Sequence, residues 1–203
     1  MTNEIFDIYG NDPIALCKTW LAEAEESELN DPEAVCLATA DKEGHPSARM
    51  VLLKEISARG FKFHTNADSH KGQDIRGNPY AALCLYWKST RKQIRIEGRV
   101  EQAGEDEADE YFATRSIERK IGAWASKQST PFAHRAEMEE AVKKYEAEFA
   151  GADHIPRPPY WKGYRVIPVH IEFWIAHEAR LHTRFAYTRP ASTAPWNATW
   201  LCP

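Results

Sequence analysis

Long hydrophobic runs are missing from this sequence of 203 residues, and so is any long run of one charge. A membrane-spanning helix needs roughly 20 consecutive apolar residues, and no stretch approaches that length. The opening residues, MTNEIFDIYG, do not join a basic segment to an apolar core. We therefore expect no signal peptide, no membrane contact and a cytoplasmic location. With 26 Lys and Arg against 30 Asp and Glu, the net charge of −4 favours no nucleic-acid partner.

Cysteine and histidine patterns of the kind that bind metals are also absent. No CxxC pair occurs among the four cysteines, which are Cys17, Cys36, Cys84 and Cys202. We expect reduced thiols without disulfides. No HExxH occurs among the eight histidines. His170, His177 and His182 lie close in sequence, but their spacing matches no zinc pattern, so we expect no metal site.

The composition that remains favours a single globular domain over residues 1–203, with residues 1–11 flexible. A chain with 43% hydrophobic and 28% charged residues is long enough to bury a sizeable core. A helix is predicted to begin at Asp12 and Pro13, an N-cap residue followed by a favoured first helical residue. After it, apolar residues recur at helical spacing through Ala24.

Short alternating segments then predict strands over 35–40, 48–56, 61–65, 80–87, 93–100, 169–176 and 180–188. Helices are predicted over 69–76, 106–114 and 133–149. Strands that follow one another like hairpins, with helices inserted between them, favour an antiparallel α+β or barrel domain over a βαβ series.

Several short blocks carry more information about function. They are RMVLLK (49–54), QIRIEG (93–98), IGAWASKQS (121–129) and RLHTR (180–184). In order and spacing, these blocks resemble the pyridoxamine 5′-phosphate oxidase family from about residue 12 to the C-terminus. The resemblance implies an α+β fold, a predominantly antiparallel split β-barrel with peripheral helices. It also implies a homodimer that binds FMN at the subunit interface.

By this resemblance, the FMN-binding residues are Arg49, Met50, Val51, Leu52, Lys54, His64, Thr65, His70, Lys71, Gln93, Gln128, Ser129, Trp174 and Arg184. The residue types suit the ligand. A phosphate requires cations, hydroxyl groups and backbone N–H groups at a helix start, and amides such as Gln93 and Gln128 can serve the polar edge of the flavin. Any of these cations alone is more often a surface charge, and Trp174 alone is more often a core residue, but the complete pattern favours the functional interpretation.

The resemblance also implies a vitamin B6 phosphate as substrate. The residues expected to bind it are Lys54, Tyr111, Arg115, Arg119, Arg180 and His182. Tyr111 and Arg115 are four positions apart on a predicted helix, so we expect both on one face. Arg180 and His182 are two positions apart on a predicted strand, so we expect them on the same side and assign them catalytic roles in orienting the substrate.

The expected reaction oxidises pyridoxamine or pyridoxine 5′-phosphate to pyridoxal 5′-phosphate, with oxygen as acceptor and hydrogen peroxide as product. Two alternatives remain open: a related flavin oxidase of the phenazine-biosynthesis type, and a split-barrel protein that binds flavin or heme without catalysis. The retained Lys54 favours the first interpretation over the phenazine type.

This chain departs from the usual family residues at His64, His70, Arg119 and Thr183, where Tyr or Phe, Arg, Ser and Asp are common. Because histidine loses its charge near neutral pH, we expect the affinity for FMN to fall between about pH 6.5 and 8.5 if His70 binds the phosphate.

Overall fold

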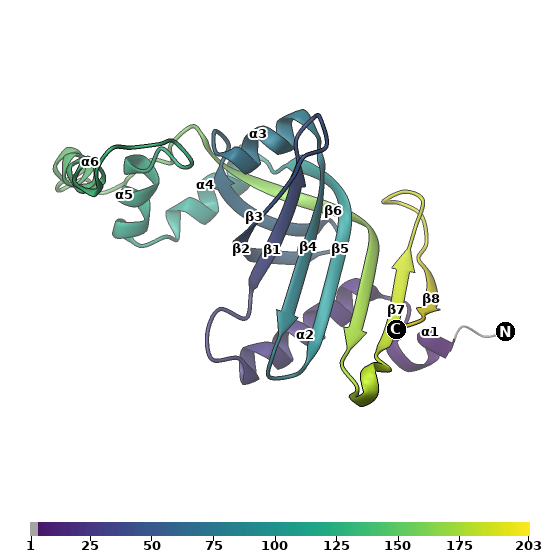
Figure 1. Ribbon diagram of the computed structural model, residues 1–203. Helices are drawn as coiled ribbons and strands as arrows, with labels where there is room; N and C mark the ends of the chain where they lie inside the picture. Colours follow the sequence, from purple (N-terminus) through teal and green to yellow (C-terminus); the bar gives the residue numbers. More distant parts are fainter. Residues whose placement is uncertain (1–3) are drawn as a thin grey trace.

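The computed structural model describes residues 4–203 (Figure 1). The strands are β1 (Ala34–Ala40), β2 (Pro46–Ser57), β3 (Gly60–Asn66), β4 (Tyr80–Trp87), β5 (Lys92–Gln102), β6 (Trp161–Ile175), β7 (Thr183–Thr188) and β8 (Asn197–Leu201). The helices are α1 (Glu4–Tyr9), α2 (Pro13–Ser27), α3 (His70–Gly77), α4 (Glu105–Ala113), α5 (Ile117–Ala125) and α6 (Arg135–Glu148), with a short 3-10 turn, η1 (Glu178–Arg180).

The strands form one antiparallel sheet in the order β3-β2-β1-β4-β5-β6-β7-β8, and a further pairing of β3 with β6 closes it. The long strand β6 makes this seam. Its first part, Trp161–Val166, pairs with β3, and its last part, His170–Ile175, pairs with β7. Strands β1 to β6 therefore close into a barrel, and β7 and β8 continue past the seam. The predicted antiparallel α+β barrel is confirmed.

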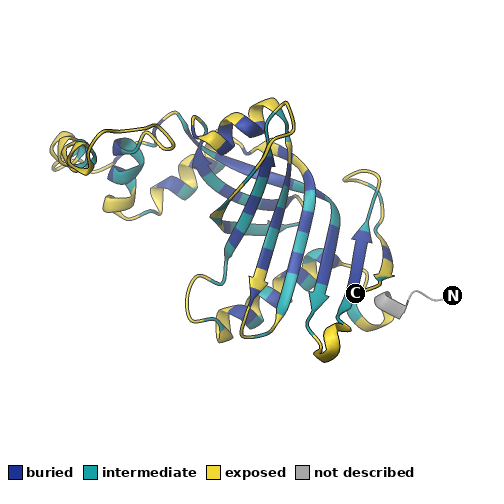
Figure 2. Cartoon of the chain, viewed as in Figure 1, coloured by how far each residue is buried: buried dark blue, intermediate teal, exposed yellow. Residues whose placement is uncertain are grey.

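The core fills the barrel and continues under α2. Phe61, Phe63 and Ile94 are fully buried inside it. Trp20 of α2 packs edge-on against Phe173 with 5.0 Å between ring centroids. The side chain of Asp12 accepts hydrogen bonds from the first backbone N–H groups of α2, as the sequence predicts. Figure 2 shows that buried residues run along the strands, whereas α6 is exposed.

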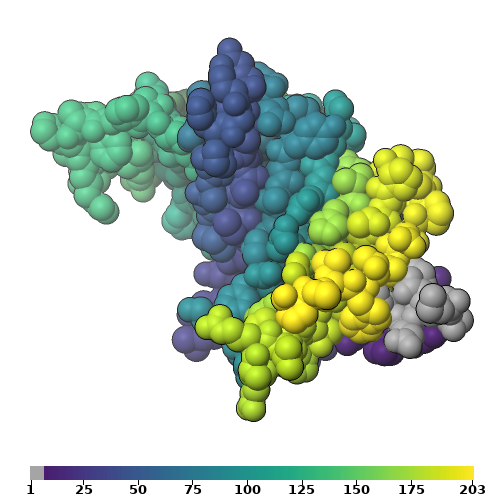
Figure 3. All heavy atoms as spheres, turned by 45° about the vertical axis from the view of Figure 1, so that its right-hand side comes forward, coloured from purple at the N-terminus to yellow at the C-terminus, as the bar shows by residue number. Residues whose placement is uncertain are grey.

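Helices α5 and α6 extend away from the barrel on the side opposite β7 and β8 (Figures 1 and 3). The two helices pack together through Trp124 of α5, whose ring lies 5.7 Å from the ring of Tyr145 and 5.7 Å from that of Phe149. Hydrogen bonds from Thr65 and Lys71 to Gln128 tie the segment after α5 to β3 and α3. This placement is relevant to function because the IGAWASKQS block lies there.

The structure adds elements that the sequence patterns did not predict. These are α5, β8 and the first half of β6. Residues 1–11 were expected to be flexible; the structure has helix α1 at Glu4–Tyr9, and residues 1–3 lie outside the described part. Between residues 4 and 203, no helix combines the length and the apolar character that crossing a membrane requires.

Candidate active site

A cavity of about 820 Å³ opens between β2, β3 and the helices at the upper end of the barrel. Its lining comprises Ser47, Ala48, Arg49, Met50, Val51, Leu52, Lys54, His64, Thr65, His70, Lys71, Tyr111, Arg115, Arg119, Gln128, Ser129 and Trp161. All the predicted FMN-binding residues except Gln93, Trp174 and Arg184 are therefore found in one place. The predicted substrate residues Tyr111, Arg115 and Arg119 line the same space.

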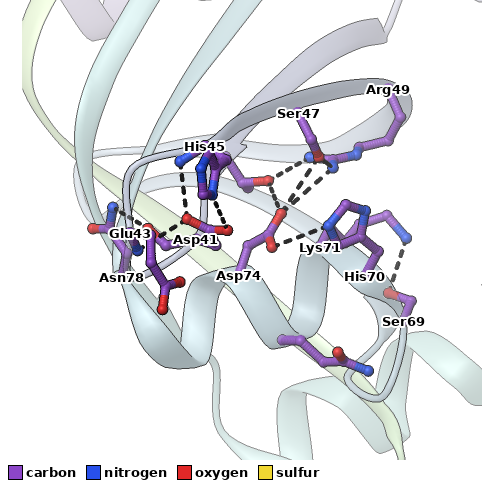
Figure 4. Close-up of polar contacts among 12 residues, drawn as sticks. Asp41, Glu43, His45, Ser47, Arg49, Ser69, His70, Lys71, Asp74 and Asn78 are labelled. Atoms are coloured by element: carbon purple, nitrogen blue, oxygen red, sulfur yellow. Dashed lines mark hydrogen bonds and ion pairs between the residues drawn. The ribbon is translucent and has the colours of Figure 1, made fainter.

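Arg49 is fixed at one side of the cavity by a buried carboxylate (Figure 4). Its guanidinium donates to the hydroxyl of Thr39 at 2.6 Å and also to that of Ser47, and it lies 3.6 Å from Asp74 Oδ2. The side chain of Asp74 is only 4% exposed, and its Oδ2 accepts a 2.6 Å hydrogen bond from the same Thr39 hydroxyl. A residue of α3 thus orients a cation that the sequence places on β2.

His70 shares the same carboxylate. It is the first residue of α3, and its Nε2 lies 3.4 Å from Asp74 Oδ1, one helical turn further on (Figure 4). The His70 side chain is 64% exposed and lines the cavity. The position suits the predicted phosphate contact, which stays a prediction. Asp74 offsets part of any positive charge that His70 carries.

Lys71 is the least exposed of the cationic side chains that β2 and α3 contribute to the cavity. Its side chain donates hydrogen bonds to Ser69 Oγ at 3.0 Å and to Gln128 Oε1 at 2.9 Å, and the residue is 7% exposed. Thr65 donates to the same Gln128 oxygen at 3.2 Å. Burial lowers the pKa of Lys71 to about 8, and the charge of Arg49 contributes. No carboxylate pairs with Lys71 in the part of the chain described. A buried cation without a counter-charge is costly unless an anion binds beside it.

The other half of the cavity has an aromatic wall. The His64 imidazole stacks on the rings of both Tyr111 and Trp161, at centroid distances of 4.3 and 4.8 Å, and these two rings lie 6.0 Å apart. Burial lowers the pKa of His64 to about 4, and the charges of Lys62 and Arg115 act in the same direction. The imidazole is therefore neutral near pH 7. Within residues 4–203, neither of its ring nitrogens has a hydrogen-bond partner.

Arg115 lies two positions past the end of α4, which ends at Ala113, one residue before the predicted end. Its guanidinium carbon lies 5.1 Å from the Trp161 ring and 5.5 Å from the Phe112 ring. Arg115 and Tyr111 line the same cavity, so the expected juxtaposition is present although Arg115 is not helical. Burial lowers the pKa of Arg115, and nearby Arg119 adds to the effect.

Helix α4, which carries Tyr111, is tied to the barrel by Glu107. This carboxylate accepts hydrogen bonds from Arg165 at 2.8 Å, Arg59 at 2.9 Å and Lys62 at 3.0 Å. The hydrogen bonds from Arg165 and Lys62 lower the pKa of Glu107 to about 2. The network fixes the start of α4 on β3 and β6, one helical turn before Tyr111.

The remaining predicted FMN residues form a second group, here called the tryptophan row: Gln93, Trp174 and Arg184. They are cross-strand neighbours on β5, β6 and β7, since Gln93 pairs with Trp174 and Trp174 pairs with Arg184. The buried Glu172 accepts from Arg184 Nε at 2.8 Å and from Arg95 at 3.0 Å. The tryptophan row does not line the cavity of its own chain.

The strand predicted over 180–188 is wrong at its start. Arg180 belongs to η1 and has a φ of +60°, and β7 begins only at Thr183. Strand alternation therefore does not relate Arg180 to His182, because the backbone turns there. The structure still places His182 beside the tryptophan row, with its ring 4.6 Å from that of Trp174. Its Nδ1 accepts a 3.2 Å hydrogen bond from the backbone of His177.

Several residues of the site were not predicted from the sequence. Asp74 and Glu172 orient predicted arginines, and Trp161 completes the aromatic wall. Asp74 carries a detectable signal, since it lies four positions after His70 on a predicted helix. Trp161 precedes the predicted start of its strand and carries none.

The fold and the cavity together define a split-barrel protein with a cavity that is lined by cationic side chains. The solved structure of PhzG from Burkholderia lata 383, in complex with tetrahydrophenazine-1-carboxylic acid, is 33% identical, with a TM-score of 0.90 over 100% of this chain and 98% of that one. A Nostoc punctiforme protein, described as pyridoxamine 5′-phosphate oxidase-related and FMN binding, has a TM-score of 0.75. It is 17% identical over 95% of this chain and 98% of its own, so it supports the fold alone.

Two family models match this chain. One, described as pyridoxamine 5′-phosphate oxidase, matches residues 21–149. The other, described as the pyridoxine 5′-phosphate oxidase C-terminal dimerisation region, matches residues 161–203. Curated proteins of Brucella canis and Brucella suis, named pyridoxine/pyridoxamine 5′-phosphate oxidase, are 50% identical over 204 residues and 100% of both chains. The chain belongs to the pyridoxamine 5′-phosphate oxidase family, and the resemblance stated from its motifs is confirmed.

Proposed function

We propose that this chain is a cytoplasmic, FMN-dependent oxidase that converts pyridoxamine or pyridoxine 5′-phosphate to pyridoxal 5′-phosphate. The observation that carries the proposal is the buried Lys71, which donates hydrogen bonds to Ser69 and Gln128 but has no carboxylate partner among the described residues. A phosphate of FMN beside Lys71 and Arg49 would supply the missing negative charge. The hydroxyl group of Ser129 is a further donor on the same wall, which the Thr65 hydroxyl, hydrogen-bonded to Gln128, also lines.

Two separate groups of cations in one cavity fit two phosphorylated ligands. Arg49, His70 and Lys71 form the first group, on β2 and α3. Arg115 and Arg119 belong to the second, beside the aromatic wall, and neither pairs with a carboxylate anywhere in residues 4–203. We assign the first group to FMN and the second to the substrate phosphate.

A homodimer would complete the site. The tryptophan row lies outside the cavity of its own chain. Exposed apolar residues occur in both regions: Met50 and Leu52 line the cavity, and the ring of Tyr86 lies 6.4 Å from that of Trp174. The match to a dimerisation region over residues 161–203 supports association through the part of the chain that carries Trp174 and Arg184. We propose that the tryptophan row of each subunit faces the cavity of the other and contributes to FMN binding there.

The proposed reaction removes two electrons and two protons from the substrate. Pyridoxamine phosphate, oxygen and water give pyridoxal phosphate, ammonia and hydrogen peroxide; pyridoxine phosphate and oxygen give pyridoxal phosphate and hydrogen peroxide. FMN, when bound, supplies the capacity to accept the electrons and pass them to oxygen. The protein binds both phosphates and orients the reacting carbon. Arg180 and His182 are assigned to substrate orientation, and His182 can accept or donate a proton at a ring nitrogen.

A second candidate is an oxidase of the phenazine-biosynthesis type. The full-length similarity to the Burkholderia lata protein, which was solved in complex with tetrahydrophenazine-1-carboxylic acid, favours it. The arginines of the substrate half favour the first candidate, since two guanidinium groups match a phosphate dianion better than a single carboxylate.

The test is oxidation by the purified protein reconstituted with FMN. We expect pyridoxamine 5′-phosphate to give pyridoxal 5′-phosphate and hydrogen peroxide in equal amounts, and pyridoxamine without its phosphate to react at least about a hundredfold less efficiently, as the loss of charge-assisted hydrogen bonds implies. Turnover of tetrahydrophenazine-1-carboxylic acid, with none of the B6 phosphates, would favour the second candidate. Light scattering should give the mass of a dimer.

A further inference from the structure

A network of charged side chains connects four separate elements next to the aromatic wall. Glu55 lies on β2, Lys62 on β3, Arg165 on β6 and Glu107 on α4. The first three are neighbours across the sheet, because Glu55 pairs with Lys62 and Lys62 pairs with Arg165. The network borders the cavity, since the charge of Lys62 is the largest contribution after burial to the lowered pKa of His64.

The cations of this network are shared by the two carboxylates. Arg165 Nη2 donates a 2.8 Å hydrogen bond to Glu107 Oε2 and lies 3.4 Å from both carboxylate oxygens of Glu55. Lys62 Nζ lies 3.0 Å from Glu107 and 2.5 Å from Glu55. Arg59, whose side chain is 61% exposed, adds contacts of 2.9 and 3.8 Å. Like charges at directly opposed strand positions repel each other, so Lys62 and Arg165 depend on both carboxylates.

Strand β2 has a bulge where it meets the network. Leu53 pairs with Phe63 and Glu55 pairs with Lys62, so Lys54 is an extra residue on β2 that has no partner on β3. A bulge bends its strand and redirects the side chain of the extra residue. Lys54 lines the cavity, and its direction therefore depends on how the next residue, Glu55, is held.

Glu107 connects the same network to another wall of the cavity. It lies four positions before Tyr111 on α4, so the two side chains share one face of the helix and move together. Tyr111 lines the cavity together with Lys54, and its ring stacks 4.3 Å from that of His64. The shared cations thus join the β2 wall of the substrate half to the α4 wall.

We propose that Glu55 and Glu107 are positioning residues. With their shared cations they form a carboxylate bridge, which fixes Tyr111 of α4 relative to Lys54 at the bulge of β2. Neither carboxylate lines the cavity, so both act through the residues that do. The inference rests on the proposed function and adds to it the structure that sets the spacing of the substrate half. Loss of either carboxylate opens the bridge.

A double-mutant cycle tests the carboxylate bridge. The four proteins are the wild type, Glu55→Gln, Glu107→Gln and the double variant, each assayed as FMN-loaded protein for KM and kcat with pyridoxamine 5′-phosphate. Because a bridge is broken by the loss of either end, we expect each single replacement to raise KM about tenfold. The double replacement should also raise KM about tenfold rather than about a hundredfold. The value of kcat should stay within about twofold of wild type, since the loss concerns binding.

The matched control is Asp106→Asn. Asp106 shares the first turn of α4 with Glu107 and is exposed. Its replacement removes the same charge from the start of the helix, where a negative charge is favourable. Asp106 makes no ion pair with Lys62 or Arg165 in the described part of the chain, so the variant should keep the KM of wild type.

Two outcomes overturn the inference: a rise of about a hundredfold in the double variant, which indicates independent effects, and a Glu55→Gln variant with the KM of wild type. The second outcome is decisive even if the double variant does not fold, which thermal unfolding of each protein reveals.

Calorimetric binding of pyridoxal 5′-phosphate repeats the cycle without turnover. Non-additive losses of affinity in a protein that oxidises no B6 phosphate would reject the proposed function alone. Additive losses in an active oxidase would reject the carboxylate bridge alone. A wild type that neither binds nor oxidises a B6 phosphate would reject both.

Discussion

Lys71 Nζ donates a 2.9 Å hydrogen bond to the side-chain oxygen of Gln128, a residue 57 positions away in the sequence. The contact joins the start of α3 to the segment after α5. It brings the IGAWASKQS block to the cavity and leaves a buried ammonium facing it. The proposed recognition of FMN depends on this relationship.

Replacing Lys71 should weaken FMN binding. A charge-assisted hydrogen bond contributes about 1.5–3 kcal/mol, so Lys71→Met should raise the Kd for FMN roughly ten- to a hundredfold. The pKa of Lys71 in the free protein is about 8, so its charge is lost as pH rises through that value. The phosphate is already dianionic there, and the affinity for FMN should therefore fall above about pH 8. Lys71→Arg keeps its charge and should show a flatter profile. Fluorescence quenching titrations measure both effects, and identical profiles for wild type and Lys71→Arg would exclude Lys71 as the titrating ligand.

Arg115→Ala should affect the substrate and spare the cofactor. The guanidinium lies in the half of the cavity assigned to the substrate phosphate, with the aromatic wall beside it. We expect KM for pyridoxamine 5′-phosphate to rise roughly ten- to a hundredfold through the lost charge-assisted hydrogen bonds. Steady-state kinetics and the flavin content of the purified variant test this. A colourless variant with an unchanged KM would assign Arg115 to the other phosphate.

Arg180 and His182 should affect flavin reduction more than flavin binding. Both lie at the turn before β7, and the ring of His182 packs 4.6 Å from that of Trp174. Alanine variants should keep FMN and be reduced more slowly, because the reacting carbon is less well oriented. Stopped-flow measurement of anaerobic reduction gives the rate directly. Reduction at the wild-type rate in both variants would remove the two residues from the mechanism.

His64 should limit stability in acid. Its pKa is about 4 in the folded protein, below the value of about 6.5 expected for an unfolded chain. Between these values the unfolded state binds more protons, so this residue lowers the free energy of unfolding as pH falls from about 6.5 to 4. His64→Phe keeps an aromatic ring stacked on Tyr111 and Trp161 and removes this effect. The Tm of wild type should therefore decline more steeply than that of the variant.

A matched control for this prediction is His134→Phe, because His134 is exposed and precedes α6. Its Tm should follow the wild-type dependence on pH. Parallel curves for His64→Phe and wild type would mean that the buried imidazole does not titrate as described.

Where burial alternates regularly, the sequence predicts the strands well. The strand predicted over 80–87 has the observed bounds of β4, because Ala81, Leu83, Leu85 and Trp87 face the core while the intervening residues do not. The first half of β6 was not predicted, since four consecutive residues from Gly163 to Val166 are buried at the seam and period-two alternation is lost. Seam strands cannot be recognised from periodicity alone.

The residues of the candidate site were likewise predicted only in part from the sequence. The motif residues were predicted because each belongs to a block of recognisable chemistry and spacing. Glu172 was not, since a single glutamate in a strand looks like an ordinary surface charge until its cross-strand neighbour, Arg95, is known. The turn at Arg180 was also mispredicted, because its positive φ is unusual for a residue other than glycine and leaves no signal in an alternating sequence.

The most direct test of the proposed function is anaerobic mixing of the FMN-loaded protein with pyridoxamine 5′-phosphate, followed through the visible absorbance of the oxidised flavin. We predict that this absorbance is lost in a single turnover, that pyridoxal 5′-phosphate forms in an amount equal to the flavin, and that admitting oxygen restores the absorbance. A flavin that stays oxidised in the presence of saturating pyridoxamine or pyridoxine 5′-phosphate would contradict the proposed function.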